Sequence, residues 1–219
     1  MSENVENTAE NEGETAAAET EAKVETLTTL FKAEASHEVI AAHLDGLDEE
    51  ERLKQVRAFP GSLQGKLYDL VAHTIPLRLD HFVPEFDAEV IWAGKNSAPA
   101  FKYFAKAFWR RAGEAVAIGY NVQFWRWASG PGYFTALDDP DSDELLFDYT
   151  KVPDWKPEQW PALEPNSGII AGPVYKGMMD YNRAVSKTVA IGRAFKGSTF
   201  KDGKHIAHYL VTRVSKLPE

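Results

Sequence analysis

Two arginines occupy positions where the local pattern calls for an apolar residue. In the stretch 116–127, V-A-I-G-Y-N-V-Q-F-W-R-W, apolar residues recur at every second position, as in a half-buried strand, and Arg126 continues the series. Arg193 does the same within 188–196, T-V-A-I-G-R-A-F-K. A buried guanidinium is costly unless a carboxylate pairs with it. We therefore expect Arg126 and Arg193 to point into a cavity and to hold a ligand carboxylate there.

Acids and phenols that could transfer a proton adjoin each other along the chain. Asp148 precedes Tyr149 in an expected strand, and Asp180 precedes a second tyrosine in an expected helix. A carboxyl group whose pKa is raised by an apolar cavity can act as a general base, with Tyr149 or His208 assisting. The alternatives also stay open: the acids pair with the two arginines, the arginines reach solvent at strand ends, or Asp148 is an ordinary surface residue.

The sequence predicts no metal site and no cofactor. The chain has no cysteine, and His205 and His208 are the only two of its six histidines that lie close together in sequence. Three residues apart in a strand, their side chains are expected on opposite faces. The glycine-rich nucleotide motifs, the G-x-S-x-G elbow and the H-E-x-x-H zinc motif are all missing. The sequence leaves catalysis open and favours a binding protein over an enzyme.

Aromatic side chains cluster around the arginine-containing stretch and suit the wall of an apolar pocket. Together with Arg126 and Arg193, the expected ligand-binding residues are Tyr120, Phe124, Tyr133 and Trp155. The segment 151–173 is rich in proline and tryptophan, and a long irregular segment of this kind usually covers something. It is therefore the candidate lid, and equally a candidate surface for a protein partner.

Charge argues against nucleic acid as a partner. The net charge is −9, from 24 basic and 33 acidic residues. Residues 1–25 contain eight glutamates and one lysine, so residues 1–23 are expected to form a disordered acidic tail. The N-terminus resembles no signal peptide and no run is apolar enough to cross a bilayer, so we expect a cytoplasmic protein with no membrane span. The sequence does not indicate an oligomeric state.

The chain changes character near residue 87. Residues 24–86 show helical spacing of apolar residues in several short runs, and the last of these runs covers 62–72. Residues 87–219 are expected to form a barrel-like domain on which these helices pack, with strands at 88–92, 116–127, 133–137, 145–150, 188–196 and 205–214. Two further segments, 101–112 and 174–186, are predicted as short helices; in the first, Lys106 falls on a solvated basic face.

This order of elements predicts an α+β protein, with N-terminal helices followed by an antiparallel curved sheet or β-barrel. Residues 88–214 resemble the lipocalin-like, calycin-type barrels, including bacterial members with helices ahead of the barrel. The resemblance implies a small hydrophobic or amphipathic ligand inside the barrel, lipid-like in character and with or without a carboxylate. The alternative fold is a cone of the nuclear transport factor 2 type, which would suit an isomerase, cyclase or dehydratase. A protein-interaction module is the third hypothesis.

Overall fold

The computed structural model describes residues 25–98, 102–122, 130–169, 171–197 and 203–218, and within them eight strands close into one antiparallel barrel. Each strand pairs with its neighbour in sequence, and β8 pairs with β1 to complete the circle. The predicted α+β class and the helices-then-barrel order are confirmed. The strands are β1 (Glu89–Asn96), β2 (Tyr103–Trp109), β3 (Ala117–Val122), β4 (Phe134–Asp138), β5 (Leu145–Asp148), β6 (Met178–Ala184), β7 (Val189–Lys196) and β8 (Lys204–Val214).

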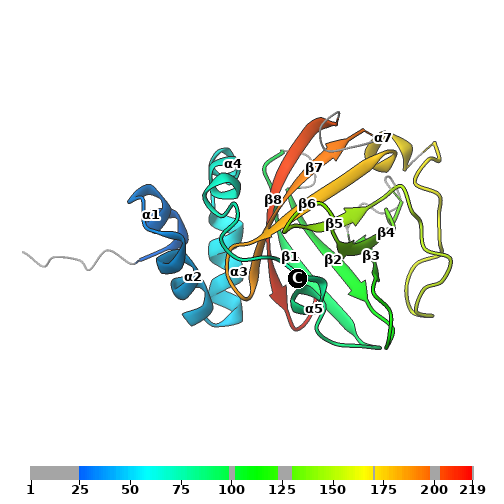
Figure 1. Ribbon diagram of the computed structural model, residues 1–219, viewed down its shortest axis with the longest axis horizontal. Helices are drawn as coiled ribbons and strands as arrows, with labels where there is room; N and C mark the ends of the chain where they lie inside the picture. The colour runs from blue at the N-terminus through cyan, green and yellow to red at the C-terminus, as the bar shows by residue number, and fades with distance from the viewer. Residues whose placement is uncertain (1–24, 99–101, 123–129, 170, 198–202, 219) are drawn as a thin grey trace, which may run out of the picture.

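Four helices lie against one side of the barrel (Figure 1). They are α1 (Leu27–Lys32), α2 (His37–Gly46), α3 (Glu49–Ala58) and α4 (Gly61–Leu70). Asp48 begins α3 by accepting a hydrogen bond from the backbone N–H of Glu51 at 2.8 Å. From the same helix, Arg52 donates to the Thr212 hydroxyl of β8 at 2.8 Å. Helix α3 also contacts β1, so it lies over the seam where the first and last strands meet.

Aromatic rings fill one end of the barrel. Helix α5 (Leu79–Phe82) lies at that end, away from α7 (Gly172–Tyr175) at the other (Figure 1). Phe82 is fully buried and stacks on Trp92, with ring centroids 3.9 Å apart and planes within 4° of parallel. It also meets Phe108 and Phe147, at 5.1 and 5.5 Å between centroids. This end of the barrel is therefore a packed core.

The inward and outward faces of two strands are the reverse of what the sequence predicts. In β3 and β7 the small residues point into the barrel. The bulky residues point outward, to the helices and to residues 151–173, which we call the proline-rich segment. A Cβ atom added to Gly192 would lie 2.1 Å from the Tyr209 ring, and one added to Gly119 would lie 2.5 Å from Phe134. The interior of a small barrel is narrow, so small residues leave room for the rings of neighbouring strands.

Two segments predicted as helices are strands. The apolar residues of 101–112 follow helical spacing, but β2 is buried on both faces, so both of its faces are rich in apolar and aromatic residues. The segment 174–186 contains only the short helix α7 before it continues as β6. In β6, Asp180 and Asn182 point into the barrel and Tyr181 points outward. The sequence of this strand therefore lacks the usual alternation of buried apolar and exposed polar residues. Asp180 is therefore on a strand.

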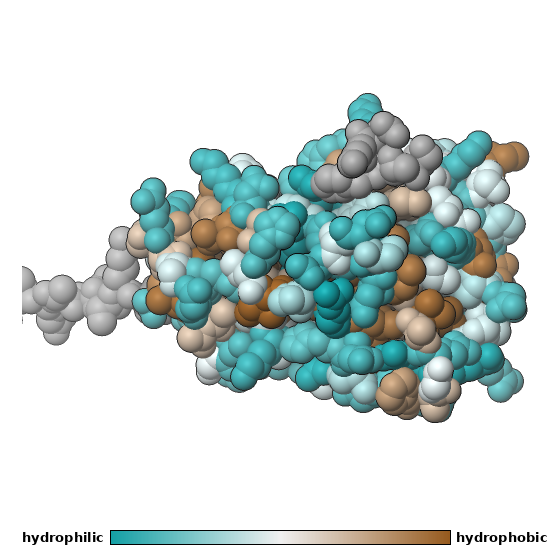
Figure 2. Space-filling view, in the orientation of Figure 1, coloured by the Kyte–Doolittle hydropathy of each residue, from teal (hydrophilic) through white to brown (hydrophobic). Residues whose placement is uncertain are grey.

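Apolar side chains appear as separate patches among hydrophilic ones on the face shown in Figure 2. The outer aromatic residues of β2 and β3, and Tyr133 just before β4, are instead covered by the proline-rich segment, through Trp160, Trp155, Val152 and Leu163. Among the residues described, none of the helices has the length and hydrophobicity needed to cross a bilayer.

Candidate functional site

A cavity of about 320 Å³ occupies the end of the barrel opposite α5. Its rim is formed by the ends of β1 and β7, the start of β8 and helix α7, through Asn96, Lys196, Ile206 and Val174. Its apolar wall includes Phe104, Tyr175, Met178 and Ala194, and its polar wall consists of Lys106, Asn121, Tyr149, Asp180 and Tyr209. The volume is at the small end of the range for ligand pockets, roughly 300–1,000 Å³.

Lys106 is the charged group at the centre of this polar wall. Strand β2 directs it inward between Phe104 and Phe108, and its side chain is only 4% exposed. Its ammonium group donates to Asn121 Oδ1 at 2.8 Å, to Asp180 Oδ2 at 3.3 Å and, by a short contact, to the Tyr149 hydroxyl. An ammonium group has three donors, and all three are used.

Asp180 faces Lys106 from β6 on the other side of the barrel, and its side chain is 1% exposed. Its Oδ2 atom accepts from Lys106, from Tyr149 at 3.3 Å and from Tyr209 at 3.1 Å. Tyr209 also contacts Asn182 Oδ1 at 2.7 Å. The other carboxylate oxygen, Oδ1, is buried and has no hydrogen-bond partner among the described residues. A buried carboxylate oxygen without a donor is costly, so this atom suits a donor from a ligand.

Burial shifts the pKa values of Lys106, Tyr149 and Tyr209 in the direction that favours their neutral forms. It lowers the pKa of the Lys106 ammonium below its ordinary value, and Asp180 opposes that shift by favouring the charged form. Burial, reinforced by the nearby Asp180 carboxylate, raises the pKa values of Tyr149 and Tyr209 well above the ordinary value of 10. Both phenols therefore stay protonated at neutral pH, and each can donate a hydrogen bond.

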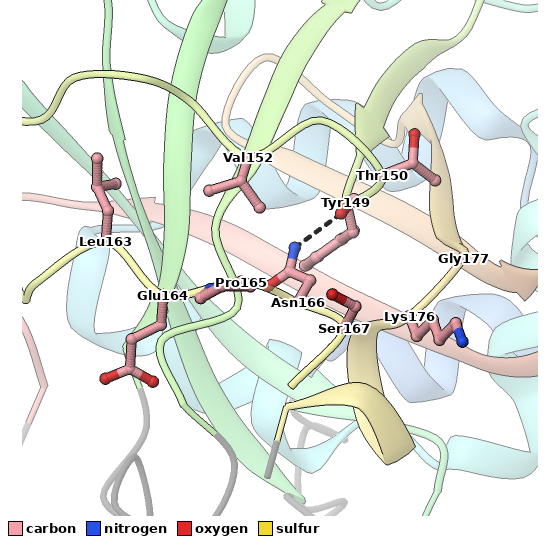
Figure 3. A pocket seen from close by; sticks show the side chains of 10 residues that line it. All are labelled: Tyr149, Thr150, Val152, Leu163, Glu164, Pro165, Asn166, Ser167, Lys176 and Gly177. Carbon is pink, nitrogen blue, oxygen red and sulfur yellow. Dashed lines mark hydrogen bonds between the residues drawn. The ribbon is translucent and has the colours of Figure 1, made fainter. Parts of the chain in front are cut away.

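A second pocket, of about 410 Å³, lies next to Tyr149 (Figure 3). It is lined by the end of the proline-rich segment, where Asn166 donates to the backbone carbonyls of Tyr133 and Tyr149 at 2.6 and 2.7 Å. Glu164 and Lys176 lie on opposite sides of it (Figure 3). Tyr149 lines both this pocket and the barrel cavity.

Several residues expected to bind the ligand lie on the outer surface of the barrel wall. Tyr120 and Tyr133 are buried beneath Trp160, with ring centroids 4.8 and 6.3 Å from it. Trp155 is half-buried in the same cluster, and the Arg111 guanidinium lies over its ring. The expectation that these rings face the cavity is therefore wrong, and it fails because bulky residues line the outer face of β3.

Arg193 also points away from the cavity. It lies on the outer face of β7, where its guanidinium sits 4.6 Å from the centre of the Tyr68 ring of α4. The predicted inward orientation of Arg193 is wrong for the same reason, since the apolar face of β7 is the outer one. Arg126 and Phe124 lie outside the described residues.

Of the catalytic candidates, the structure brings together Tyr149 and Asp180. Asp148 is turned the other way, where its carboxylate contacts the backbone N–H of Thr150 at 2.9 Å and Lys151 at 3.2 Å. His208 lies on the outer face of β8 beside Tyr68. The expectation that His205 and His208 face opposite ways is wrong, because a bulge at Ile206 restores them to one face, with ring centroids 4.5 Å apart.

The surroundings of His208 predict that the stability of the protein depends on pH. Burial, aided by His205 and Arg193, lowers the pKa of His208 from 6.5 to about 4. The folded state therefore favours the neutral ring, and stability is complete above pH 6.5 and is lost as the pH falls toward 4. The loss from one proton is at most about 1.4 kcal/mol per pH unit, and the partial exposure of His208 to solvent makes it smaller.

Urea unfolding at several pH values between 7 and 4 measures this effect. We expect H208Q to lose less stability over that interval than the wild-type protein. The control is H73N, at an exposed histidine, which should keep the wild-type pH dependence. Equal slopes for H208Q and wild type would contradict the assignment.

The residues that sequence reasoning missed are Lys106, Asn121 and Tyr209. Lys106 shows the same sequence pattern as the two arginines, because it takes the place of an apolar residue in the alternating series Phe104, Lys106, Phe108. The helix prediction for 101–112 hid that signal. Asn121 falls between the apolar positions of the stretch 116–127, so the pattern predicts it on the face away from the cavity. Nothing in the sequence distinguishes Tyr209 from any other strand tyrosine. Among the described residues, no three histidine or acidic side chains are grouped to hold a metal ion.

Comparison with known proteins adds no family to this picture: no family model, no curated protein and no solved structure matches the chain. The eight-stranded antiparallel barrel is consistent with a lipocalin-like fold.

Proposed function

We propose that the barrel binds a small molecule with an apolar body and an uncharged polar head. The observation that carries this proposal is the Lys106–Asp180 pair on the wall of the cavity, where Asp180 Oδ1 has no donor among the residues that the structure describes. Phe104, Met178 and Ala194 provide apolar surface for the body of the ligand. A hydroxyl or carboxamide head can donate to Asp180 Oδ1 and accept from the tyrosine hydroxyls.

The head group is expected to be neutral, in place of the carboxylate suggested by the sequence. Arg193, one of the two arginines expected to hold a carboxylate, lies outside the barrel. Inside it, the Lys106 charge is already matched by Asp180, so the two charges cancel. A carboxylate would bring an uncompensated negative charge into a buried site next to Asp180, which is unfavourable.

Three ligands with the same chain test this preference. We expect octan-1-ol and octanamide to bind at least about tenfold more tightly than octanoate near neutral pH, which corresponds to about 1.4 kcal/mol. Isothermal titration calorimetry measures the three affinities. Tightest binding by octanoate would contradict the proposal.

A cavity-filling variant shows whether the ligand is inside the barrel. Ala194 points inward from β7, so A194F should weaken octan-1-ol binding by about tenfold or more. The matched control is I169F, at a side chain that is 98% exposed and is not among the residues lining the cavity. Circular dichroism confirms that both variants fold. Unchanged binding in A194F would place the ligand elsewhere.

A second candidate function is proton transfer, as in an isomerase or dehydratase. It is supported by Asp180 and Tyr149, whose Oδ2 and hydroxyl oxygen lie 3.3 Å apart on the same cavity. If Asp180 is a general base, octan-2-one in D2O should exchange the hydrogens next to its carbonyl, and NMR follows the exchange. The exchange should persist in K106R and disappear in D180N. A rate no higher than in buffer would exclude this function for that ketone.

The third hypothesis, a protein-interaction surface on the proline-rich segment, loses support. Trp160 is 4% exposed and donates to the Glu89 carboxylate at 2.6 Å. Trp155 is half-buried in the same cluster. Both tryptophans therefore serve to attach the segment to the barrel wall.

A further inference from the structure

Lys106 has surroundings that few lysines in proteins have. Its ammonium nitrogen lies between 5.1 and 5.7 Å from the centres of five aromatic rings, those of Phe104, Phe134, Phe147, Tyr149 and Tyr209. Lys106 is also one of the residues that line the cavity, and its nitrogen lies within hydrogen-bond distance of a carboxylate and a phenol. A lysine that only forms an ion pair needs neither an adjoining cavity nor a phenol beside its carboxylate partner.

We propose that Lys106 captures an aldehyde or ketone in this cavity as a covalent imine. The inference rests on the proposed function, since a carbonyl compound is one kind of uncharged ligand that the cavity would admit. A lysine amine becomes a nucleophile for carbonyl carbon when its surroundings favour the neutral form. Burial of Lys106 acts in that direction.

The groups around Lys106 balance every proton of the reaction. The ammonium first gives one proton to the Asp180 carboxylate, and the neutral amine then attacks the carbonyl carbon. A C–N bond forms, the π electrons move to oxygen, and a proton passes from nitrogen to that oxygen, with the Tyr149 hydroxyl as a relay. The product is a carbinolamine, whose hydroxyl can donate to Asp180 Oδ1.

The second half of the reaction restores the original charges. The protonated Asp180 gives its proton to the carbinolamine hydroxyl, the C–O bond breaks, and water leaves. The nitrogen lone pair forms the C=N bond, so the nitrogen again carries one positive charge opposite an Asp180 carboxylate. One carbonyl compound is consumed and one water is released. An apolar lining slows the return of water and so protects the imine from hydrolysis.

Reductive trapping tests the proposal. The folded protein is incubated with octanal and sodium cyanoborohydride, which reduces an imine to a stable secondary amine, and the modified lysines are located by peptide mass spectrometry. We expect an octyl group on Lys106 at a level about tenfold or more above that on Lys54, because binding raises the local concentration of the aldehyde. Lys54 is the control lysine, with a side chain that is 75% exposed.

Competition separates the imine from ligand binding itself. Excess octan-1-ol should suppress labelling of Lys106 and leave that of Lys54 unchanged, and K106R should lose the site. If octan-1-ol binds in the cavity but Lys106 remains unlabelled while Lys54 is labelled, the imine is wrong and the proposed function stands. If octan-1-ol, octanamide and octanal all fail to bind, the proposed function and the imine both fall.

Discussion

Replacing Lys106 by methionine is expected to destabilise the protein by about 3–5 kcal/mol. The substitution keeps the length and apolar character of the side chain but leaves the Asp180 carboxylate buried without its counter-ion. It also removes the donor to Asn121 Oδ1 and Tyr149. Equilibrium unfolding in urea, followed by circular dichroism, gives the change in the free energy of unfolding.

The double variant K106M/D180N identifies the cause of this loss. An amide at position 180 carries no charge and can still accept from Tyr209, so the double variant should recover most of the stability that K106M loses. K54M is the matched control, because Lys54 forms an exposed, solvent-screened ion pair with Glu51 whose loss should change the stability little. A stability of K106M equal to that of wild type would show that the buried pair is not charged.

Replacing Phe82 by alanine is expected to cost about 3–5 kcal/mol, as for other large buried rings. Phe82 is fully buried at the closed end of the barrel, and Trp92, Phe108 and Phe147 pack around it. Removing the ring leaves a void that these neighbours cannot fill without moving their strands. Urea unfolding measures the loss, and the near-ultraviolet circular dichroism of the tryptophans should change with it.

F86A provides the comparison for F82A. Phe86 is 48% exposed, and the guanidinium carbon of Arg110 lies 4.9 Å from the centre of its ring. Its removal should cost about 1 kcal/mol or less. A similar loss in the two variants would mean that the stacked rings do not form the core of that end.

Strand periodicity predicted an antiparallel curved sheet or barrel but not the direction in which each strand faces. In β3 and β7 bulky and small residues alternate clearly, but both faces of each strand are buried. One face lies in the barrel interior, and the other is covered by helices or by the proline-rich segment. Alternation distinguishes a buried face from a solvated one. It carries no information when both are buried, so Arg193 and Tyr120 were placed on the wrong side.

The candidate site depended on the two strands that the sequence misassigned. Lys106 lies on β2 and Asp180 on β6, and both were expected on helices. Their 3.3 Å contact joins residues separated by 74 positions, and it exists only because the barrel closes. Tyr149 and Asp180 could be named from their residue types alone, whereas their meeting with Lys106 required the topology.

The seam between β1 and β8 sets the order in which the chain can complete its fold. Strand β1 cannot obtain its second neighbour until β8, near the C-terminus, has been synthesised, and α3 packs over that same seam. The helices are made first, yet the surface that buries them is finished last. Contacts between segments that are far apart in the sequence slow folding. During synthesis, we expect the apolar faces of these helices to remain uncovered until the final strand is added.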